Sequence, residues 1–191
     1  MTDEAKRERE SWWVLRAQSG DREALDELLK AVEEPLSRYI YSLVGERSPT
    51  EDILQEVFMR IYRKLRWLRE PALFRAWAYR IASRETFRHL RGERQWQEQV
   101  RDEEALKSLP AAPPAREEFA PELRAELQLR VAGLPAASRA VIVLHYLHEM
   151  SLEEVAAVLE IPPGTVKSRL SYGLASLRRQ FAEAHSQGGR G

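Results

Sequence analysis

The spacing of apolar residues along the chain is that of α-helices. Between residues 21 and 43, apolar residues recur every three to four positions, as on one buried helix face. They are Leu25, Leu28, Leu29, Val32, Leu36, Tyr39, Ile40 and Leu43. Asp21, directly after Gly20, is a suitable N-cap, and Pro35 is expected to kink this helix. Because few runs alternate with the period of two that strands require, we predict an all-α fold.

A second helix is predicted over 50–66. Its start signal combines a capping-box serine, Ser48, a proline at the first helical position, Pro49, and a glutamate three residues after the cap, Glu51. The apolar face consists of Ile53, Leu54, Val57, Phe58, Ile61, Tyr62 and Leu65. The other side carries Asp52, Gln55, Glu56, Met59 and Arg60. After a turn around Pro71, a third helix is predicted over 73–94.

Residues 96–122 have a different composition from the segments on either side. They are acidic, and an Ala/Pro stretch with Pro110, Pro113, Pro114 and Pro121 cannot hold a regular helix. Four shorter helical patterns follow, over 123–132, 136–148, 151–159 and 163–182. We therefore predict two small helical domains, 1–95 and 123–185, joined by a flexible linker over 96–122 and followed by a disordered tail over 186–191.

The last two patterns indicate a helix-turn-helix. Ser151 and Glu154 form a capping box, and a short turn with two prolines leads into the second helix. The core face of that helix is predicted to be Val166, Leu170, Leu174, Leu177 and Phe181. The outer face is predicted to hold Ser168, Ser171, Tyr172, Ala175, Arg178 and Arg179, with Lys167 and Arg169 beside them. In this motif the outer face enters the major groove of DNA. An ordinary helical hairpin with a polar outer face has the same spacing and stays an alternative.

A stripe of arginines lies along the predicted helix over 73–94. Its core side is marked by Phe74, Ala78 and Ile81, and its stripe by Arg80, Arg84 and Arg91 with Phe87 beside them. Guanidinium groups bind phosphates and aromatic faces stack on unpaired bases, so this combination is typical of single-strand binding. A solvated arginine face is the alternative, and Trp77 is assigned to the core rather than to base stacking.

The formal net charge of zero conceals an uneven distribution. Residues 60–94 hold 11 basic and 3 acidic side chains, whereas residues 1–59 hold 8 basic and 14 acidic ones. Because local potential governs phosphate contact, the basic segment can attract a polyanion even though the whole chain is neutral. With 43% hydrophobic and 31% charged residues, the composition is that of a soluble globular protein.

Several classes of site are absent from the sequence. The chain has no cysteine, which excludes disulfides, thiolate metal sites and cysteine nucleophiles. No apolar run approaches the roughly 20 residues that span a bilayer, and the N-terminus is charged, so we expect a cytoplasmic protein without membrane insertion. His145 and His148 share a helix face, but no further histidine or cysteine lies near them to complete a metal site. We predict no cofactor, no small-molecule substrate and no enzymatic activity.

Both halves of the chain resemble the extracytoplasmic-function sigma factors, the small branch of the housekeeping sigma superfamily. The segments GDREALDELL, EDILQEVFMRIYRKL and FRAWAYRIA resemble the family's second conserved region. The segment LPAASRAVIVLHYLHEMSLEEVAAVLEIPPGTVKSRLSYGLASLRR resembles its fourth region. The resemblance implies a protein that binds core RNA polymerase and promoter DNA and directs promoter-specific initiation. It also implies an anti-sigma factor as a partner.

The resemblance further implies roles for individual residues. The residues implied to contact the clamp helices of the largest polymerase subunit are Asp52, Gln55 and Glu56. Contact with the melted minus-ten element falls to the loop around Glu70, Pro71 and Ala72 and to Arg80, Arg84, Phe87, Arg88 and Arg91. Contact with the minus-thirty-five duplex falls to Thr165, Lys167, Ser168, Arg169, Ser171 and Tyr172.

Two positions depart from the family pattern. Glu160 stands where a glycine is common in the turn, and a left-handed conformation there strains a residue that has a Cβ atom. The stretch 171–174 is poorer in arginine than usual, and Gly173 weakens its helix by about 1 kcal/mol relative to alanine. Two other functions therefore stay open. They are a sigma mimic that occupies an anti-sigma partner without initiating transcription, and a stand-alone helix-turn-helix regulator.

Overall fold

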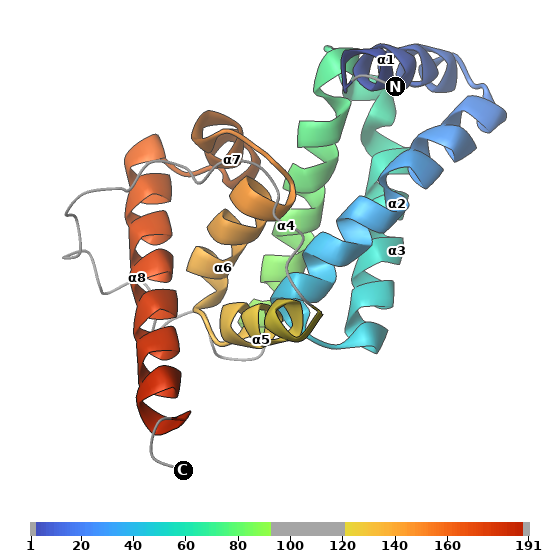
Figure 1. The fold of residues 1–191 in the computed structure, drawn as a ribbon. Coiled ribbons are helices and arrows are strands. Elements are labelled where there is room, and N and C mark those ends of the chain that lie inside the picture. Colours follow the sequence, from blue (N-terminus) through green and yellow to red (C-terminus); the bar gives the residue numbers. More distant parts are fainter. Residues whose placement is uncertain (1–2, 93–120, 189–191) are drawn as a thin grey trace. The chain divides into compact units, whose positions relative to one another are not determined.

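The computed structural model describes residues 3–92 and 121–188, and every regular element in these ranges is helical (Figure 1). The elements are α1 (Asp3–Gln18), α2 (Arg22–Val44), α3 (Arg47–Lys64), the 3-10 turns η1 (Leu65–Trp67) and η2 (Pro71–Leu73), α4 (Phe74–Gly92), α5 (Pro121–Ala132), α6 (Ala136–Ile142), the π-helical turn η3 (Val143–Leu147), α7 (Leu152–Leu159) and α8 (Pro163–Gly188). The all-α prediction is confirmed. Of the predicted linker, 96–120 lie outside the described residues.

The described helices fall into two compact units. The N-terminal unit holds α1 to α4, and the C-terminal unit holds α5, α6, η3, α8 and most of α7. Two predicted limits differ from the structure. Helix α5 begins at Pro121 and α8 continues to Gly188, so both helices extend beyond the predicted second domain, 123–185.

Helix α2 is the centre of the N-terminal unit, because α1, α3 and α4 all pack against it. Its buried face is Ala24, Leu28, Val32, Leu36, Tyr39, Ile40 and Leu43. The ring of Tyr39 meets that of Tyr79 edge to face, with 5.6 Å between centroids, and its hydroxyl lies 2.8 Å from Ser83 Oγ. Burial raises the pKa of Tyr39 far above its ordinary value and that of Tyr79 to about 12. Both phenols are therefore neutral core groups.

The starts of α2 and α3 test the predicted capping signals. Asp21 caps α2 as predicted, since its carboxylate accepts the Ala24 N–H at 3.1 Å, and this bond lowers the pKa of the carboxyl. The predicted capping box at Ser48 is wrong. Helix α3 begins at Arg47, and its N-cap residue Glu46 makes no side-chain cap. Pro49 fits inside this first turn because the N–H groups there have no intrahelical acceptor.

Two helical faces differ from the predicted stripes. Leu25 and Leu29 of α2 are only half-buried, and Tyr62 of α3 is 65% exposed although it was assigned to the apolar face. Helix α2 runs through Pro35 without a break in its helical assignment. The apolar spacing thus identified both helices but overestimated the width of their buried faces.

Helix α1 was not predicted from the spacing of apolar residues. It packs on α2 and on both 3-10 turns, yet Val14 is its one fully buried apolar side chain among those described. Its other buried side chain is a carboxylate, Glu10, which pairs with Arg75 of α4. A helix that is attached through polar groups leaves little hydrophobic periodicity to detect.

The C-terminal unit is built around the packing of α8 on α6. On α8, the predicted core residues Val166, Leu170 and Leu177 are buried, while Leu174 and Phe181 are half-buried. Gly173 is buried where α8 faces Ser138 and Ile142 of α6. A Cβ atom on Gly173 would lie 2.5 Å from Ile142 Cδ1 and 3.5 Å from Ser138 Cβ. Because it has no side chain, Gly173 allows α8 to pack closely on α6. This close packing accounts for a residue of low helix propensity inside α8.

We expect Gly173→Ala to destabilise the C-terminal unit. The gain of about 1 kcal/mol in helix propensity is outweighed by overpacking, which costs about 1–3 kcal/mol. In an Ile142→Val background, which removes Cδ1, the same substitution should be neutral or stabilising. Urea unfolding of the four proteins measures both effects. Stabilisation by Gly173→Ala in the wild-type background would contradict the close approach.

Candidate nucleic-acid and polymerase interfaces

The arginine stripe lies on α4 opposite its buried side. Phe74, Ala78 and Ile81 are buried as predicted. Of the residues assigned to nucleic acid, Arg84, Arg88 and Arg91 are exposed, and Arg80 and Phe87 are half-buried. Counting 100° per residue places Arg80, Arg84, Phe87 and Arg91 within a narrow sector and Arg88 to one side of it. Several guanidinium groups thus lie along one line of α4, an arrangement suited to contact with a phosphate backbone.

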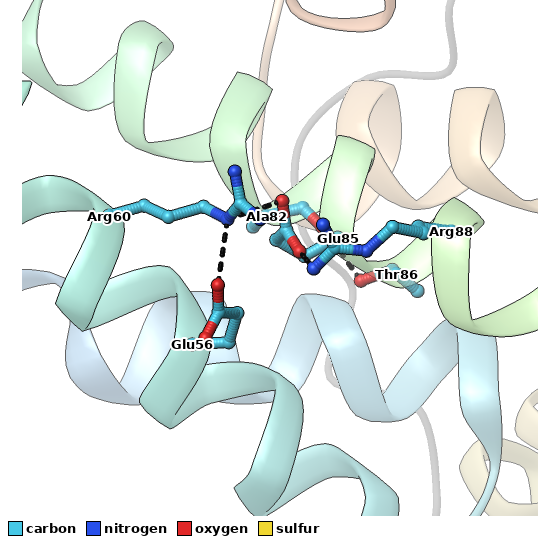
Figure 2. A network of polar contacts seen from close by, with 6 residues as sticks. All are labelled: Glu56, Arg60, Ala82, Glu85, Thr86 and Arg88. Atoms are coloured by element: carbon cyan, nitrogen blue, oxygen red, sulfur yellow. Dashed lines mark hydrogen bonds and ion pairs between the residues drawn. The ribbon is translucent and has the colours of Figure 1, made fainter.

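Arg88 belongs to a second cluster, a network of ion pairs between α3 and α4 (Figure 2). Glu85, only 6% exposed in its side chain, pairs with Arg88 one turn along α4 and with Arg60 of α3, whose Nε lies 2.7 Å from Glu85 Oε1. The same Arg60 Nε lies 3.0 Å from Glu56 Oε1. Charges therefore alternate from Glu56 through Arg60 and Glu85 to Arg88.

This network joins two sets of residues that sequence reasoning assigned to different partners. An open hollow of about 300 Å³ is lined by Asp52, Ile53, Glu56, Glu85, Arg88 and His89. It brings Asp52 and Glu56, the predicted polymerase contacts, next to Arg88, a predicted DNA contact. Gln55, the third residue predicted to contact polymerase, is exposed on α3.

Sequence reasoning missed Glu85 and the role of Arg60. A buried carboxylate needs a cation beside it, because removing its charge from water is costly. A signal was present, since Glu85 is one of only three acidic residues among 60–94. An isolated glutamate on an arginine-rich helix is a candidate for internal pairing rather than for solvent.

A further residue that sequence reasoning missed is Trp67, in η1 between α3 and α4. Its side chain is 61% exposed, and the Arg66 guanidinium carbon lies 3.9 Å from the centre of a Trp67 ring. An exposed indole with a cation above it offers both a stacking surface and a positive charge. It lies just before the predicted loop of Glu70, Pro71 and Ala72, of which Glu70 and Ala72 are exposed.

The helix-turn-helix is formed by α7 and α8. Ser151 and Glu154 make the predicted capping box, with the Ser151 N–H donating to Glu154 Oε2 at 2.8 Å and the Glu154 N–H donating to Ser151 Oγ at 3.1 Å. In the turn, Glu160 has φ of 55°, so the left-handed conformation expected at this position is confirmed. A residue with a Cβ atom is strained in this conformation, so Glu160 makes the turn less stable than a glycine would.

The predicted duplex-reading residues lie in the first three turns of α8. Lys167 is exposed, while Thr165, Ser168, Arg169, Ser171 and Tyr172 are half-buried. The Ser168 hydroxyl donates to the Thr165 carbonyl at 3.0 Å, which leaves its lone pairs to accept from a base. Burial lowers the pKa of Arg169, but a guanidinium stays charged in proteins. Ala175, Arg178 and Arg179 are exposed further along the helix.

Of the two histidines in this unit, His145 and His148, the first has a structural role. His145 Nδ1 lies 2.7 Å from the Met150 carbonyl oxygen, across the turn that follows η3. Within 3–92 and 121–188, no group of three or more histidine, cysteine or acidic side chains could hold a metal ion. In the same ranges, none of the helices combines the length and apolarity needed to cross a membrane.

Comparison with known families matches both units. The family model for sigma-70 region 2 matches residues 28–96, and that for sigma-70 region 4 matches residues 124–177. The ECF RNA polymerase sigma factor SigW of Bacillus subtilis is 29% identical over 89% of this chain and 95% of its own. The sigma-H factor of Pseudomonas aeruginosa is 31% identical (85% and 89% covered), and the ECF sigma-E factor of Escherichia coli K12 is 32% identical (82% and 86%).

Solved structures show the same fold. CnrH in complex with the cytosolic domain of CnrY has a TM-score of 0.67 and 22% identity, and the match covers 92% of this chain and 98% of CnrH. The sigma factor RpoE of Bartonella quintana, in complex with the anti-sigma factor NepR, has a TM-score of 0.63 and 23% identity, with 82% and 96% covered. Since both conserved regions match in order and the relatives align over most of their length, this chain belongs to the extracytoplasmic-function sigma factors, which direct RNA polymerase to promoters.

Proposed function

We propose that this sigma factor divides three contacts among three helices. The α3 surface of Asp52, Gln55 and Glu56 docks on the clamp helices of the largest polymerase subunit. The arginine face of α4, with Trp67 before it, engages the melted minus-ten strand, and α8 contacts the minus-thirty-five duplex. The observation that carries the proposal is the arginine face itself, aligned along α4 opposite its buried side.

The minus-ten contact is supported by two kinds of group. Arg80, Arg84 and Arg91 supply charge for phosphates, and Trp67 supplies a flat aromatic surface for an unpaired base. A duplex does not expose base faces in this way, so the combination favours a melted strand. Phe87, half-buried within the arginine sector, is suited to contact a sugar or a base edge.

The minus-thirty-five contact is supported by the outer face of α8, where Lys167 is exposed beside small polar side chains. Such a surface carries few cations, and a weak contact is expected. When one of two domains on the same chain is bound, the effective concentration of the other near its own DNA element rises. The predicted linker over 96–122 would therefore allow two weak contacts together to hold the promoter. The domain limits 1–95 and 123–185 are part of this proposal.

An anti-sigma factor is the further partner that we propose. RpoE of Bartonella quintana, which shares this fold, was solved with its anti-sigma factor NepR. The proposed role consists of binding alone, in the cytoplasm where promoter DNA and polymerase are found. It needs no cofactor and no catalytic step by this chain.

The proposed function is tested by transcription in vitro from genomic fragments with core polymerase. Wild-type protein should produce specific new transcripts, and Arg80→Glu with Arg84→Glu should reduce open complexes by about 100-fold or more, since two charge-assisted contacts are reversed. Core binding should stay close to wild type. The control Arg22→Glu with Arg38→Glu makes the same charge change on α2. If the α4 variant loses core binding as strongly as it loses open complexes, the proposed division between a polymerase-docking surface on α3 and a DNA-binding surface on α4 is wrong.

For α8, we expect Lys167→Ala to reduce the slope of log affinity against log salt by about 0.9, the effect of one phosphate contact. Ser168→Ala or Tyr172→Phe should instead change sequence preference, because side chains that reach base edges carry specificity. Binding of minus-thirty-five duplexes by the holoenzyme at several salt concentrations measures both. An unchanged profile for all three variants would show that α8 does not contact the duplex.

In the α3–α4 network, Glu85→Gln should have opposite effects on stability and on DNA binding. The unit should lose about 1–3 kcal/mol of stability, because a buried ion pair is broken, although Arg60 keeps Glu56. Arg88, released from Glu85, should bind a minus-ten single strand in the holoenzyme about 5-fold more tightly, a gain of about 1 kcal/mol. Denaturant unfolding and strand titration measure the two effects.

The matched control for this prediction is Glu51→Gln, which removes the same charge from an exposed pair with Arg47 on α3. A surface pair contributes about 0–1 kcal/mol, so the control should change little. Weaker strand binding by Glu85→Gln would show that Glu85 orients Arg88 for DNA instead of competing with it.

A further inference from the structure

Helix α1 lies outside the family-model match to sigma-70 region 2. The match to sigma-70 region 2 begins at residue 28, after α1 has ended at Gln18. The helix nevertheless packs against η1 and η2, the two turns that connect α3 to α4. Its contacts with this connection are polar and specific, and they show what α1 adds to the unit.

The first contact is made by Gln18, the last residue of α1. Its side-chain nitrogen, Nε2, donates to the Leu65 carbonyl at 2.9 Å and to the Leu68 carbonyl at 2.8 Å. Both hydrogens of one amide are thus used, on two carbonyls that lie on either side of Arg66 and Trp67. The Leu68 N–H also donates to the Leu65 carbonyl at 3.0 Å, which closes the turn. Gln18 therefore holds both ends of η1.

The second contact is made by Glu10, two turns earlier in α1. Its carboxylate is buried and takes two bonds from Arg75 at the start of α4, one of them from Nε to Oε2 at 3.3 Å and the other from Nη2 to Oε1. Since Arg75 is the second residue of α4, just after η2 ends at Leu73, α1 is attached to the connection at both of its ends. Two attachments fix the connection against α1, whereas one would leave it free to pivot.

We propose that Gln18 is a positioning residue for minus-ten recognition. By fixing the backbone on both sides of Arg66 and Trp67, it holds the segment that carries the exposed indole in one conformation before DNA arrives. A loop that is ordered in advance does not lose its freedom on binding, so its stacking energy contributes fully to affinity and to base discrimination. This inference rests on the proposed minus-ten function, and Gln18 itself does not contact DNA.

The test uses two substitutions at Gln18 in the full-length chain. Gln18→Glu has nearly the same shape but lacks both donors and places an anion against two carbonyl oxygens, and Gln18→Met removes the donors without adding charge. The control Gln128→Glu makes the same charge change at an exposed position on α5. The thermal unfolding midpoint and core-binding affinity show whether a variant is folded and assembles.

Two measurements then separate a structural attachment from a positioning role. Hydrogen exchange of the backbone amides over 66–69 should become about 10-fold faster in both Gln18 variants and stay unchanged in the control. In the holoenzyme, open-complex formation is measured on promoters with single base changes in the minus-ten element. Both Gln18 variants should lower the ratio between preferred and disfavoured bases by about 10-fold. Binding to core polymerase should not change.

Each outcome has a definite meaning. Unchanged exchange over 66–69 in both variants would overturn the attachment of η1 by Gln18. Faster exchange with unchanged base discrimination would overturn the positioning role. A wild-type holoenzyme without any base discrimination would instead overturn the proposed minus-ten function, and the role of Gln18 with it, whatever the exchange rates show.

Discussion

A carboxylate buried between two guanidinium groups sets the relation of α3 to α4. Glu85 is withdrawn from water, so its charge must be compensated within the protein, and Arg60 and Arg88 supply that compensation from the two helices. The packing of both helices on α2 brings them together. The Arg60–Glu85 pair crosses from α3 to α4, whereas the Arg88–Glu85 pair lies within α4. The compensated carboxylate therefore lies where the proposed polymerase-docking surface meets the arginine-rich helix.

The same pairing limits how independent the two surfaces can be. Arg60 is shared between Glu85 and Glu56, and Glu56 belongs to the surface proposed for polymerase. Arg60 thus lies between a carboxylate of that surface and the buried carboxylate that pairs with Arg88. The proposed polymerase-docking surface and Arg88 therefore belong to one network of charges.

The features that were predictable from the sequence are those with a periodic or local signal. Apolar spacing located α2, α3, α4 and the two helices of the helix-turn-helix, and the capping residues Asp21 and Ser151 behave as their side chains require. The strain at Glu160 followed from its position in the turn. The proposed roles of the site residues rest on the family resemblance and on the surfaces where the fold places these residues.

The features that were not predictable depend on contacts between distant segments. Helix α1 is held by Glu10 and Gln18, whose polar side chains give no apolar periodicity. The start of α3 at Arg47 followed the course of the chain after α2 and not the serine signal at 48. From the sequence alone Glu85 resembles a surface residue, because its burial depends on the packing of α3 against α4. For Glu10, Gln18 and Glu85, the determining partner lies on another element, to which a single sequence gives no distance.

The contact between Gly173 and Ile142 has a consequence for how this family member can diverge. A side chain at 173 would meet the terminal methyl group of Ile142, so it would require that side chain to turn away or to be shorter. In a set of relatives that keep this helix spacing, a larger residue at position 173 should accompany a smaller one at position 142. The pair is thus a candidate for covariation, and it links the sequence of α6 to that of α8 at a point where neither helix alone shows the constraint.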